Sequence, residues 1–118
     1  MKNQSFFKRM GFALQGIGAA IRMESSFRLQ LLAALMVFFI LAWCRPPLIW
    51  WALLLLNCGM VLAAELFNTA LEQLIDHIHP SVHPSIKIAK DCAAGAVLLL
   101  SMSAVTMFIV FFIEIALI

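Results

Sequence analysis

The chain has few of the residues from which soluble domains build their surfaces. Only 12% of its 118 residues are charged and it contains no tyrosine, whereas 64% are hydrophobic and the mean hydropathy is +1.04. This composition lies far outside that of soluble globular domains, so an ordinary soluble fold is excluded. The net charge of +2 is too small to indicate a nucleic-acid partner.

Two kinds of sequence motif are also absent. The three cysteines, Cys44, Cys58 and Cys92, form no CxxC pair and stand in apolar surroundings, so we expect neither a disulfide framework nor a zinc site. The chain has no GxxxxGK[ST] loop, and residues 16–18 supply only a GxG fragment. Any nucleotide chemistry here is therefore neither of the P-loop nor of the protein-kinase type.

Long apolar runs are what the chain does contain. Since one membrane crossing takes about 20 residues, they predict three transmembrane helices, at residues 28–45, 47–78 and 85–114. Residues 1–27 are amphipathic and predict a helix on the membrane surface. We expect an all-α membrane protein with one domain over residues 1–118. Ser85 is a candidate helix cap, and Trp43, Trp50 and Trp51 are expected to form an interfacial belt.

The basic residues predict the orientation in the membrane. Cytoplasmic segments are enriched in Lys and Arg. Only Arg45 lies on one predicted side, and the other side carries Lys2, Lys8, Arg9, Arg22, Arg28, Lys87 and Lys90. The N-terminus is therefore expected in the cytoplasm.

Residues 64–76 emerge from an apolar run and carry half of the six acidic residues. On a helix, four polar side chains of this stretch fall within an arc of about 80°. They are Glu65, Asn68, Glu72 and Asp76. Because Glu72 and Asp76 repel each other at a spacing of four residues, we expect a counter-charge from a metal ion, a lysine or an arginine. The pattern predicts an active-site helix, with Glu65 near the membrane boundary.

Three other polar features allow more than one interpretation. Glu24 and Arg28 have the spacing of a helix salt bridge, yet Glu24 is also a candidate second metal ligand at the same membrane depth. The three histidines, at positions 77, 79 and 83, stand beside prolines and are typical of an exposed turn more than of a metal site. Glu114 is expected at the opposite surface, without a function.

The polar residues at the cytoplasmic boundary have the chemistry of phosphoryl transfer. Carboxylates bind Mg²⁺, lysine binds phosphate, and a carboxylate can take the proton of an attacking hydroxyl. A small proton-coupled transporter is an alternative, but its key carboxylate would lie near the middle of the bilayer. A non-enzymatic membrane subunit is a further alternative, and it leaves the aligned carboxylates unexplained.

Three motifs carry a resemblance to a known family. ESSFR at residues 24–28, ELFNTALE at 65–72 and AKDCAAGAV at 89–97 resemble motifs of the prokaryotic diacylglycerol kinase and undecaprenol kinase family. The resemblance covers nearly the whole chain. It implies a lipid kinase of the bacterial inner membrane that uses ATP and Mg²⁺. It also implies a homotrimeric bundle with active sites shared between protomers.

The resemblance also implies roles for individual residues. Glu65 would be the general base, and Glu24 and Glu72 would be metal ligands. The nucleotide would be bound by Lys8, Phe12, Glu24, Asn68, Glu72, Asp76, Ser81, Val82, His83, Lys90 and Asp91. The lipid substrate would contact Arg28, Glu65 and Ala94. The sequence departs from the best-known diacylglycerol kinases at Ser5, Gly18 and Gln30, where those have charged residues.

The choice of lipid alcohol rests on residues 93–97. Their sequence, AAGAV, is more similar to the undecaprenol kinases than to the diacylglycerol kinases, which often have Ser at the position of Ala94. Small residues let a slender chain approach, so we expect Ala93, Ala94 and Gly95 to line a site beside Glu65. Undecaprenol is thus the expected substrate, and diacylglycerol is the alternative.

Overall fold

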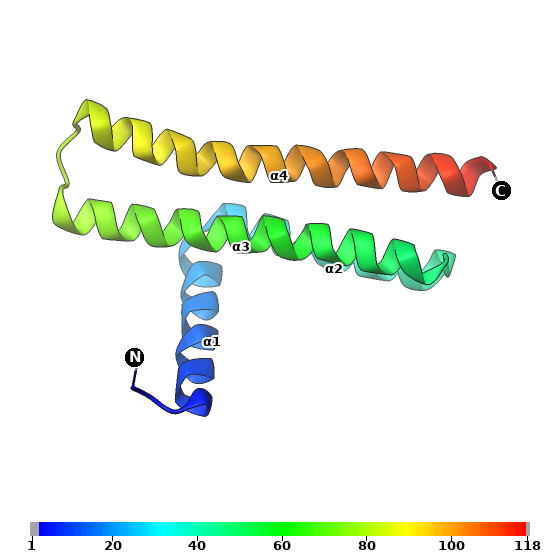
Figure 1. The fold of residues 1–118 in the computed structure, drawn as a ribbon, viewed down its shortest axis with the longest axis horizontal. Coiled ribbons are helices and arrows are strands. Elements are labelled where there is room, and N and C mark those ends of the chain that lie inside the picture. The colour runs from blue at the N-terminus through cyan, green and yellow to red at the C-terminus, as the bar shows by residue number, and fades with distance from the viewer. Residues whose placement is uncertain (1–2, 118) are drawn as a thin grey trace.

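The computed structural model describes residues 3–117, so Lys2 lies outside the described part of the chain. That part is entirely helical, as expected, and forms α1 (Phe6–Met23), α2 (Ser25–Cys44), α3 (Leu48–Ile78) and α4 (Pro84–Leu117). Helices α2, α3 and α4 lie antiparallel in chain order, with α3 in contact with both others, and α1 lies crosswise to them (Figure 1). Each of α2, α3 and α4 is long and apolar enough to cross a membrane.

The boundary between α1 and α2 differs from the expected one. Helix α1 ends at Met23 and not at residue 27, because Glu24 has an extended backbone (φ −118°, ψ 113°) and breaks the helix. Helix α2 then begins at Ser25. This elbow lets the chain turn from the crosswise direction of α1 into the bundle.

Two tight connections join the three long helices. Arg45 adopts the left-handed conformation (φ 48°) after α2, and two prolines precede α3. Helix α3 has 31 residues, about 46 Å at 1.5 Å per residue, so it is longer than a hydrocarbon core of about 30 Å. Helix α4 begins at Pro84, and the Nδ1 atom of His83 accepts a hydrogen bond from the Ser85 amide (3.1 Å). His83 therefore takes the capping role that was expected of Ser85.

A small core closes the end of the bundle that contains the α2–α3 turn. Leu41, Trp50, Leu54 and Phe111 are buried together, with the Trp50 and Phe111 rings edge to face at 5.4 Å. The Trp50 indole donates a hydrogen bond to the Glu114 carboxylate. Trp50 thus belongs to the core and not to the expected interfacial belt, and Glu114 has a structural partner in α3.

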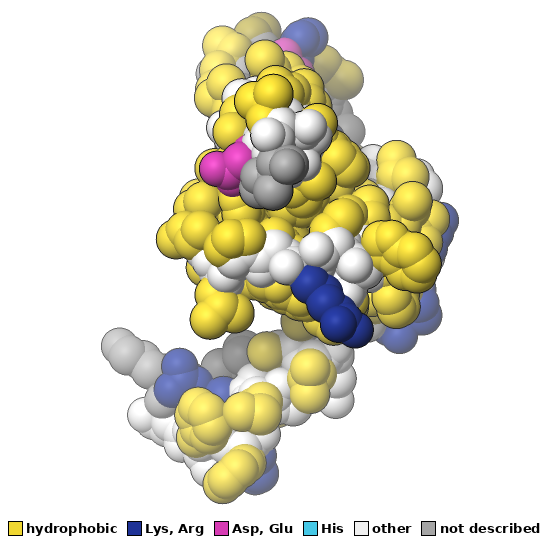
Figure 2. Space-filling view, turned by 90° about the vertical axis from the view of Figure 1, so that its right-hand side faces the viewer, with side chains coloured by type: hydrophobic (Ala, Val, Ile, Leu, Met, Phe, Trp, Pro, Cys, Tyr) yellow, Lys and Arg dark blue, Asp and Glu magenta, His cyan; other side chains and the backbone are white. Residues whose placement is uncertain are grey.

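Most of the remaining apolar side chains are exposed on the protomer. Figure 2 shows the end of the bundle opposite the α3–α4 turn, where hydrophobic side chains predominate and charged ones are few. Lysine and arginine side chains gather on α1, below the bundle in this view. Such a surface fits a hydrocarbon environment around α2, α3 and α4.

Candidate active site

One face of α3 changes from apolar to polar along its length. The buried residues of α3 are spaced by four or seven and therefore share a face. They are Trp50, Leu54, Val61, Glu65 and Thr69. Glu65 is only 6% exposed, although it is a carboxylate. Because isolated buried charges are costly, a carboxylate held here indicates a functional position.

The elbow between α1 and α2 brings a second carboxylate to this face. Glu24 and Glu72 both lie close enough to Glu65 for their negative charges to act on it. Helix α1 contacts α3 as well as α2, which fixes the elbow beside the polar part of α3. Within residues 3–117 no three His, Cys, Asp or Glu side chains form a metal-binding group. The described part of the protomer therefore supplies neighbouring carboxylates but not three side chains that together could bind a metal ion.

Two ion pairs lie at the end of α3 and the start of α4. The Lys90 Nζ contacts the Asp76 Oδ1 at 2.6 Å, and Lys87 pairs with Asp91 at 2.7 Å on α4. Lys90 thus supplies the counter-charge that the repulsion between Glu72 and Asp76 predicts. The Lys87–Asp91 pair is exposed to solvent and the Lys90–Asp76 pair is partly exposed, so each contributes little to stability.

Asn68 lies about 60° around α3 from Glu65, at the edge of the polar face. Its side chain lines a cavity of about 530 Å³ between α3 and α4, and its buried Oδ1 has no hydrogen-bond partner. Ala93 and Ala96 of α4 line the same cavity, but Ala94 and Gly95 do not. From the helical positions, this cavity is centred about 120° around α3 from Glu65. The expectation that residues 93–95 line one site beside Glu65 is therefore wrong for Ala93.

Arg28 has a structural role that the sequence did not indicate. Its guanidinium donates hydrogen bonds to the carbonyl oxygens of Ile21 (2.8 Å) and Arg22 (3.2 Å), in the last turn of α1. These carbonyls have no partner within the helix, so Arg28 caps α1 and holds the elbow. Among residues 3–117 no ion pair joins Glu24 to Arg28, so the salt-bridge alternative for these two residues is wrong.

Other predicted nucleotide-site residues are spread over the protomer. Lys8 and Phe12 lie on the half of α1 that points away from the bundle (Figure 1). Ser81, Val82 and His83 form the exposed turn before α4. There the Nδ1 of His79 lies 2.9 Å from the Ser81 carbonyl oxygen. The protomer brings Glu24, Glu65 and Glu72 together but leaves α1 and this turn apart from them.

Thr69 is a further buried polar residue of this face, and the sequence patterns did not single it out. It is 9% exposed and lies one turn beyond Glu65 on the same face of α3. Its spacing of four from Glu65 was a usable signal. The prediction selected charged and amide groups, and a threonine in an apolar helix did not stand out.

Comparisons with known proteins agree on one family. A family model described as prokaryotic diacylglycerol kinase matches residues 11–112. An undecaprenol kinase of Bacillus subtilis is 38% identical over 78% of this chain and 75% of its own length. A diacylglycerol kinase of Synechocystis is also 38% identical, over 80% of this chain, which spans about half (54%) of that relative. A diacylglycerol kinase of Escherichia coli is 32% identical over 83% of this chain and 80% of its own length.

Proposed function

The chain belongs to the prokaryotic diacylglycerol kinase family and is a lipid kinase; on this basis we propose that it transfers the γ-phosphate of ATP to a membrane-dissolved lipid alcohol. The observation that carries the proposal is the buried Glu65 carboxylate, on the α3 face that also bears Glu72. Glu65 takes the proton of the lipid hydroxyl, the hydroxyl oxygen forms a bond to the γ-phosphorus, and the bond to the β-phosphate oxygen breaks to release ADP.

Glu24 and Glu72 are the residues that would hold Mg²⁺. Carboxylate oxygens are ligands that Mg²⁺ prefers, and it usually takes only one or two carboxylates together with phosphate oxygens. The missing third protein ligand is therefore compatible with a metal that arrives with the nucleotide. When bound, the ion neutralises charge on the phosphate oxygens. Glu24, Glu65 and Glu72 repel one another, and a bound cation would offset this repulsion.

The nucleotide phosphates lie, in this proposal, between the end of α3 and the start of α4. Lys90 is a cation at this position, and its ion pair with Asp76 joins the start of α4 to the end of α3. Asp91, Asn68 and the turn at residues 81–83 complete the nucleotide side. Arg28 acts on the lipid side by fixing the elbow that carries Glu24.

A second protomer supplies the part of the site that one protomer lacks. Lys8 and Phe12 belong to the half of α1 that lies away from the bundle (Figure 1), so in this proposal they act on the carboxylates of a neighbouring protomer. We expect a homotrimer with shared sites. Mixing inactive Lys8→Ala protomers with inactive Glu65→Gln protomers should then restore some activity. Co-assembly verified by pull-down, with no recovery at any ratio, would contradict sharing.

We propose undecaprenol as the preferred alcohol and diacylglycerol as the second candidate. The AAGAV stretch at residues 93–97 supports undecaprenol, whereas relatives of similar identity carry either name. Kinetics in the same micelles, at equal surface fractions of the two lipids, test this order. A preference of about tenfold for diacylglycerol, about 1.4 kcal/mol in the transition state, would reverse it.

Phosphate transfer itself is tested with radiolabelled ATP in mixed micelles. The expected result is Mg²⁺-dependent labelling of a lipid alcohol by the wild-type protein and none by Glu65→Gln. The absence of any labelled lipid with several alcohols, together with proton flux in proteoliposomes, would favour the transporter instead.

A further inference from the structure

Two histidines of the turn between α3 and α4 use the same ring nitrogen in opposite ways. The Nδ1 atom of His79 lies 2.9 Å from the carbonyl oxygen of Ser81. A carbonyl oxygen can only accept a hydrogen bond, so this nitrogen carries a proton. The Nδ1 atom of His83 lies 3.1 Å from the amide nitrogen of Ser85. A backbone amide can only donate, so this nitrogen carries no proton and the His83 ring is neutral.

The two hydrogen bonds therefore respond differently to acid. A second proton on the His79 ring goes to Nε2 and leaves the Nδ1–H donor in place. A second proton on the His83 ring goes to Nδ1, and the bond from Ser85 is lost. Histidine is the side chain whose charge ordinarily changes between about pH 5 and pH 8. Because the neutral ring makes the bond, the His83 bond is present at the upper end of this range and is lost as the pH falls.

The His83 ring caps the start of α4. Pro84 is the first residue of the helix and has no amide hydrogen, so the Ser85 amide is the first backbone donor. The carbonyl oxygen of His83 accepts a hydrogen bond from the Lys87 amide (2.9 Å), which places His83 at the N-cap position. A protonated ring leaves the Ser85 amide without its acceptor and adds positive charge where the helix dipole disfavours it. One protonation thus weakens the start of α4 in two ways.

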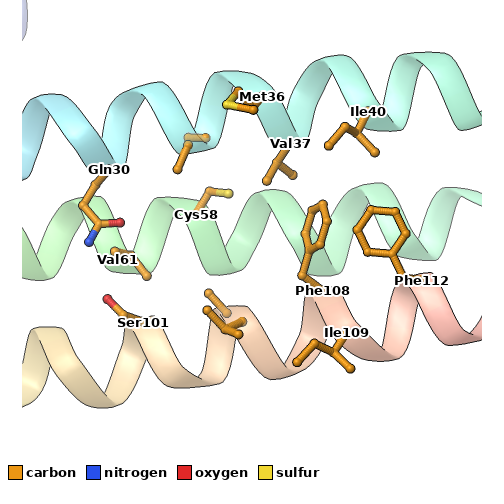
Figure 3. A pocket seen from close by; sticks show the side chains of 14 residues that line it. Gln30, Met36, Val37, Ile40, Cys58, Val61, Ser101, Phe108, Ile109 and Phe112 are labelled. Atoms are coloured by element: carbon orange, nitrogen blue, oxygen red, sulfur yellow. The ribbon is translucent and has the colours of Figure 1, made fainter.

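Little packing holds the start of α4 in place. Within the described part of the chain, none of residues 84–91 is buried, and none of them lines either cavity. The α4 side chains that line the space of about 660 Å³ between α2 and α4 begin at Ser101 (Figure 3). Segments with few buried apolar contacts open most easily, so the first turns of α4 depend on their terminal hydrogen bonds.

These first turns carry the lysine of the proposed nucleotide site. Lys90 lies about two turns after His83, and its Nζ contacts the Asp76 Oδ1 at the end of α3. We propose that neutral His83 is a positioning residue, whose cap orders the start of α4 and holds Lys90 where the ATP phosphates bind. Protonation of His83 releases this segment and weakens the binding of MgATP. The inference rests on the proposed kinase function and gives His83 a role through the backbone, without a contact to the nucleotide.

Kinetics at the two ends of the histidine range, about pH 8 and about pH 5, test this role. His83→Asn supplies a side-chain oxygen that caps a helix and does not titrate, and His83→Ala has no acceptor. At about pH 8, His83→Ala should raise the KM for MgATP about fivefold, the factor expected for the loss of one cap, with little change in kcat. His83→Asn should restore a KM near that of the wild type. At about pH 5, the KM of the wild type should exceed that of His83→Asn by a similar factor.

Other titratable groups surround the turn, and the comparison of the wild type with His83→Asn controls for them. They are Asp76, His77 and His79 on the α3 side and Lys87, Lys90 and Asp91 on α4. These groups and ATP itself are common to both proteins, so the measured quantity is the ratio of the two KM values at each pH. His77→Asn is the matched control and should follow the wild-type pH profile.

Two kinetic results would overturn the proposal. One is a KM ratio of wild type to His83→Asn that is the same at both pH values. The other is a KM of His83→Asn as high as that of His83→Ala at about pH 8, which would indicate that the imidazole itself contacts the nucleotide.

Two spectroscopic measurements on the full-length protein in micelles need no turnover. In ¹⁵N spectra of the imidazole nitrogens, the neutral ring of His83 should carry its proton on Nε2 and that of His79 on Nδ1. Backbone amides of residues 85–88 should exchange hydrogen faster in His83→Ala than in His83→Asn at the same pH. A proton on Nδ1 of neutral His83, or equal exchange in the two variants, would refute the cap.

Together these measurements separate the inference from the proposed function. An active kinase whose KM ratio does not change with pH would refute the positioning role of His83 alone. The expected ¹⁵N spectra and exchange rates, in a protein that phosphorylates no lipid alcohol, would refute the kinase function and leave His83 as the cap of α4.

Discussion

The two ends of α3 use the same buried face in opposite ways. Near its start, Trp50 and Leu54 pack against α2 and α4, and the Trp50 indole is satisfied by Glu114. Nearer its end, about 2.5 to 3.5 turns before Ile78, the same face presents Thr69 and Glu65. One end is apolar with its polar group paired, and the other is polar with carboxylates that repel one another.

This difference indicates that one end of α3 serves packing and the other end serves binding or catalysis. The packed end holds the helices together. Its charged group, the Glu114 carboxylate, has a hydrogen-bond partner in Trp50. The polar end carries an electrostatic cost that a ligand with positive charge would relieve, which is typical of binding and catalytic sites. Substitutions at the two ends should therefore separate stability from turnover.

The largest expected effect is at the polar end. Glu65→Gln keeps the size of the side chain and removes the base, so turnover should fall by about 10² to 10⁴ while the fold is retained. Radiolabelled phosphate transfer and the Tm of the purified protein are the two measurements. A correctly folded variant with near-normal turnover would remove Glu65 from the mechanism.

The next effect concerns the two other carboxylates. Glu24→Ala or Glu72→Ala should weaken Mg²⁺-dependent ATP binding about 10- to 100-fold, because each removes a charged ligand worth about 1.5 to 3 kcal/mol. ATP is titrated with and without Mg²⁺, and Glu114→Ala at the packed end is the control. If metal dependence is unchanged in both variants, these residues have only a structural role.

At the packed end, the expected effect is on stability alone. Trp50→Phe keeps the aromatic contact with Phe111 and removes the donor to Glu114, so it should cost about 1 kcal/mol of unfolding free energy. Denaturation in micelles measures this cost, and kcat should remain near that of the wild type. A large loss of turnover at wild-type stability would show that the two ends are coupled.

The smallest effect on stability is expected at the exposed ion pair. Asp76→Asn removes the partner of Lys90, but exposed pairs contribute only about 0 to 1 kcal/mol. Stability should hardly change, while the KM for ATP should change because Lys90 is redirected. High salt should reduce the difference between variant and wild type. A destabilisation well above 1 kcal/mol would instead make the pair a structural clamp.

The helices and the polar face of α3 were predictable because they follow from local patterns. The length of the three apolar runs predicted three membrane-spanning helices. The spacing of Glu65, Glu72 and Asp76 predicted that they share one face of a helix. The elbow at Glu24 was missed, because the stretch around it reads as continuous helix and the break depends on how α1 packs across α3. The hydrogen bonds of Arg28 and Trp50 were missed for the same reason, since Arg28 reaches back across the elbow and Trp50 bonds a residue 64 positions away.

The sequence by itself determined the membrane class, the family and the alignment of the acidic residues, because composition, motif order and helical periodicity are properties of the chain alone. Only the tertiary structure decided which small residues of α4 line the cavity at Asn68. Ala93 and Ala94 are neighbours in sequence, but a helix turns about 100° per residue and directs them to different sides of α4. Which of these sides adjoins the cavity depends on where α3 packs against α4, and that arrangement is set by contacts between distant parts of the chain.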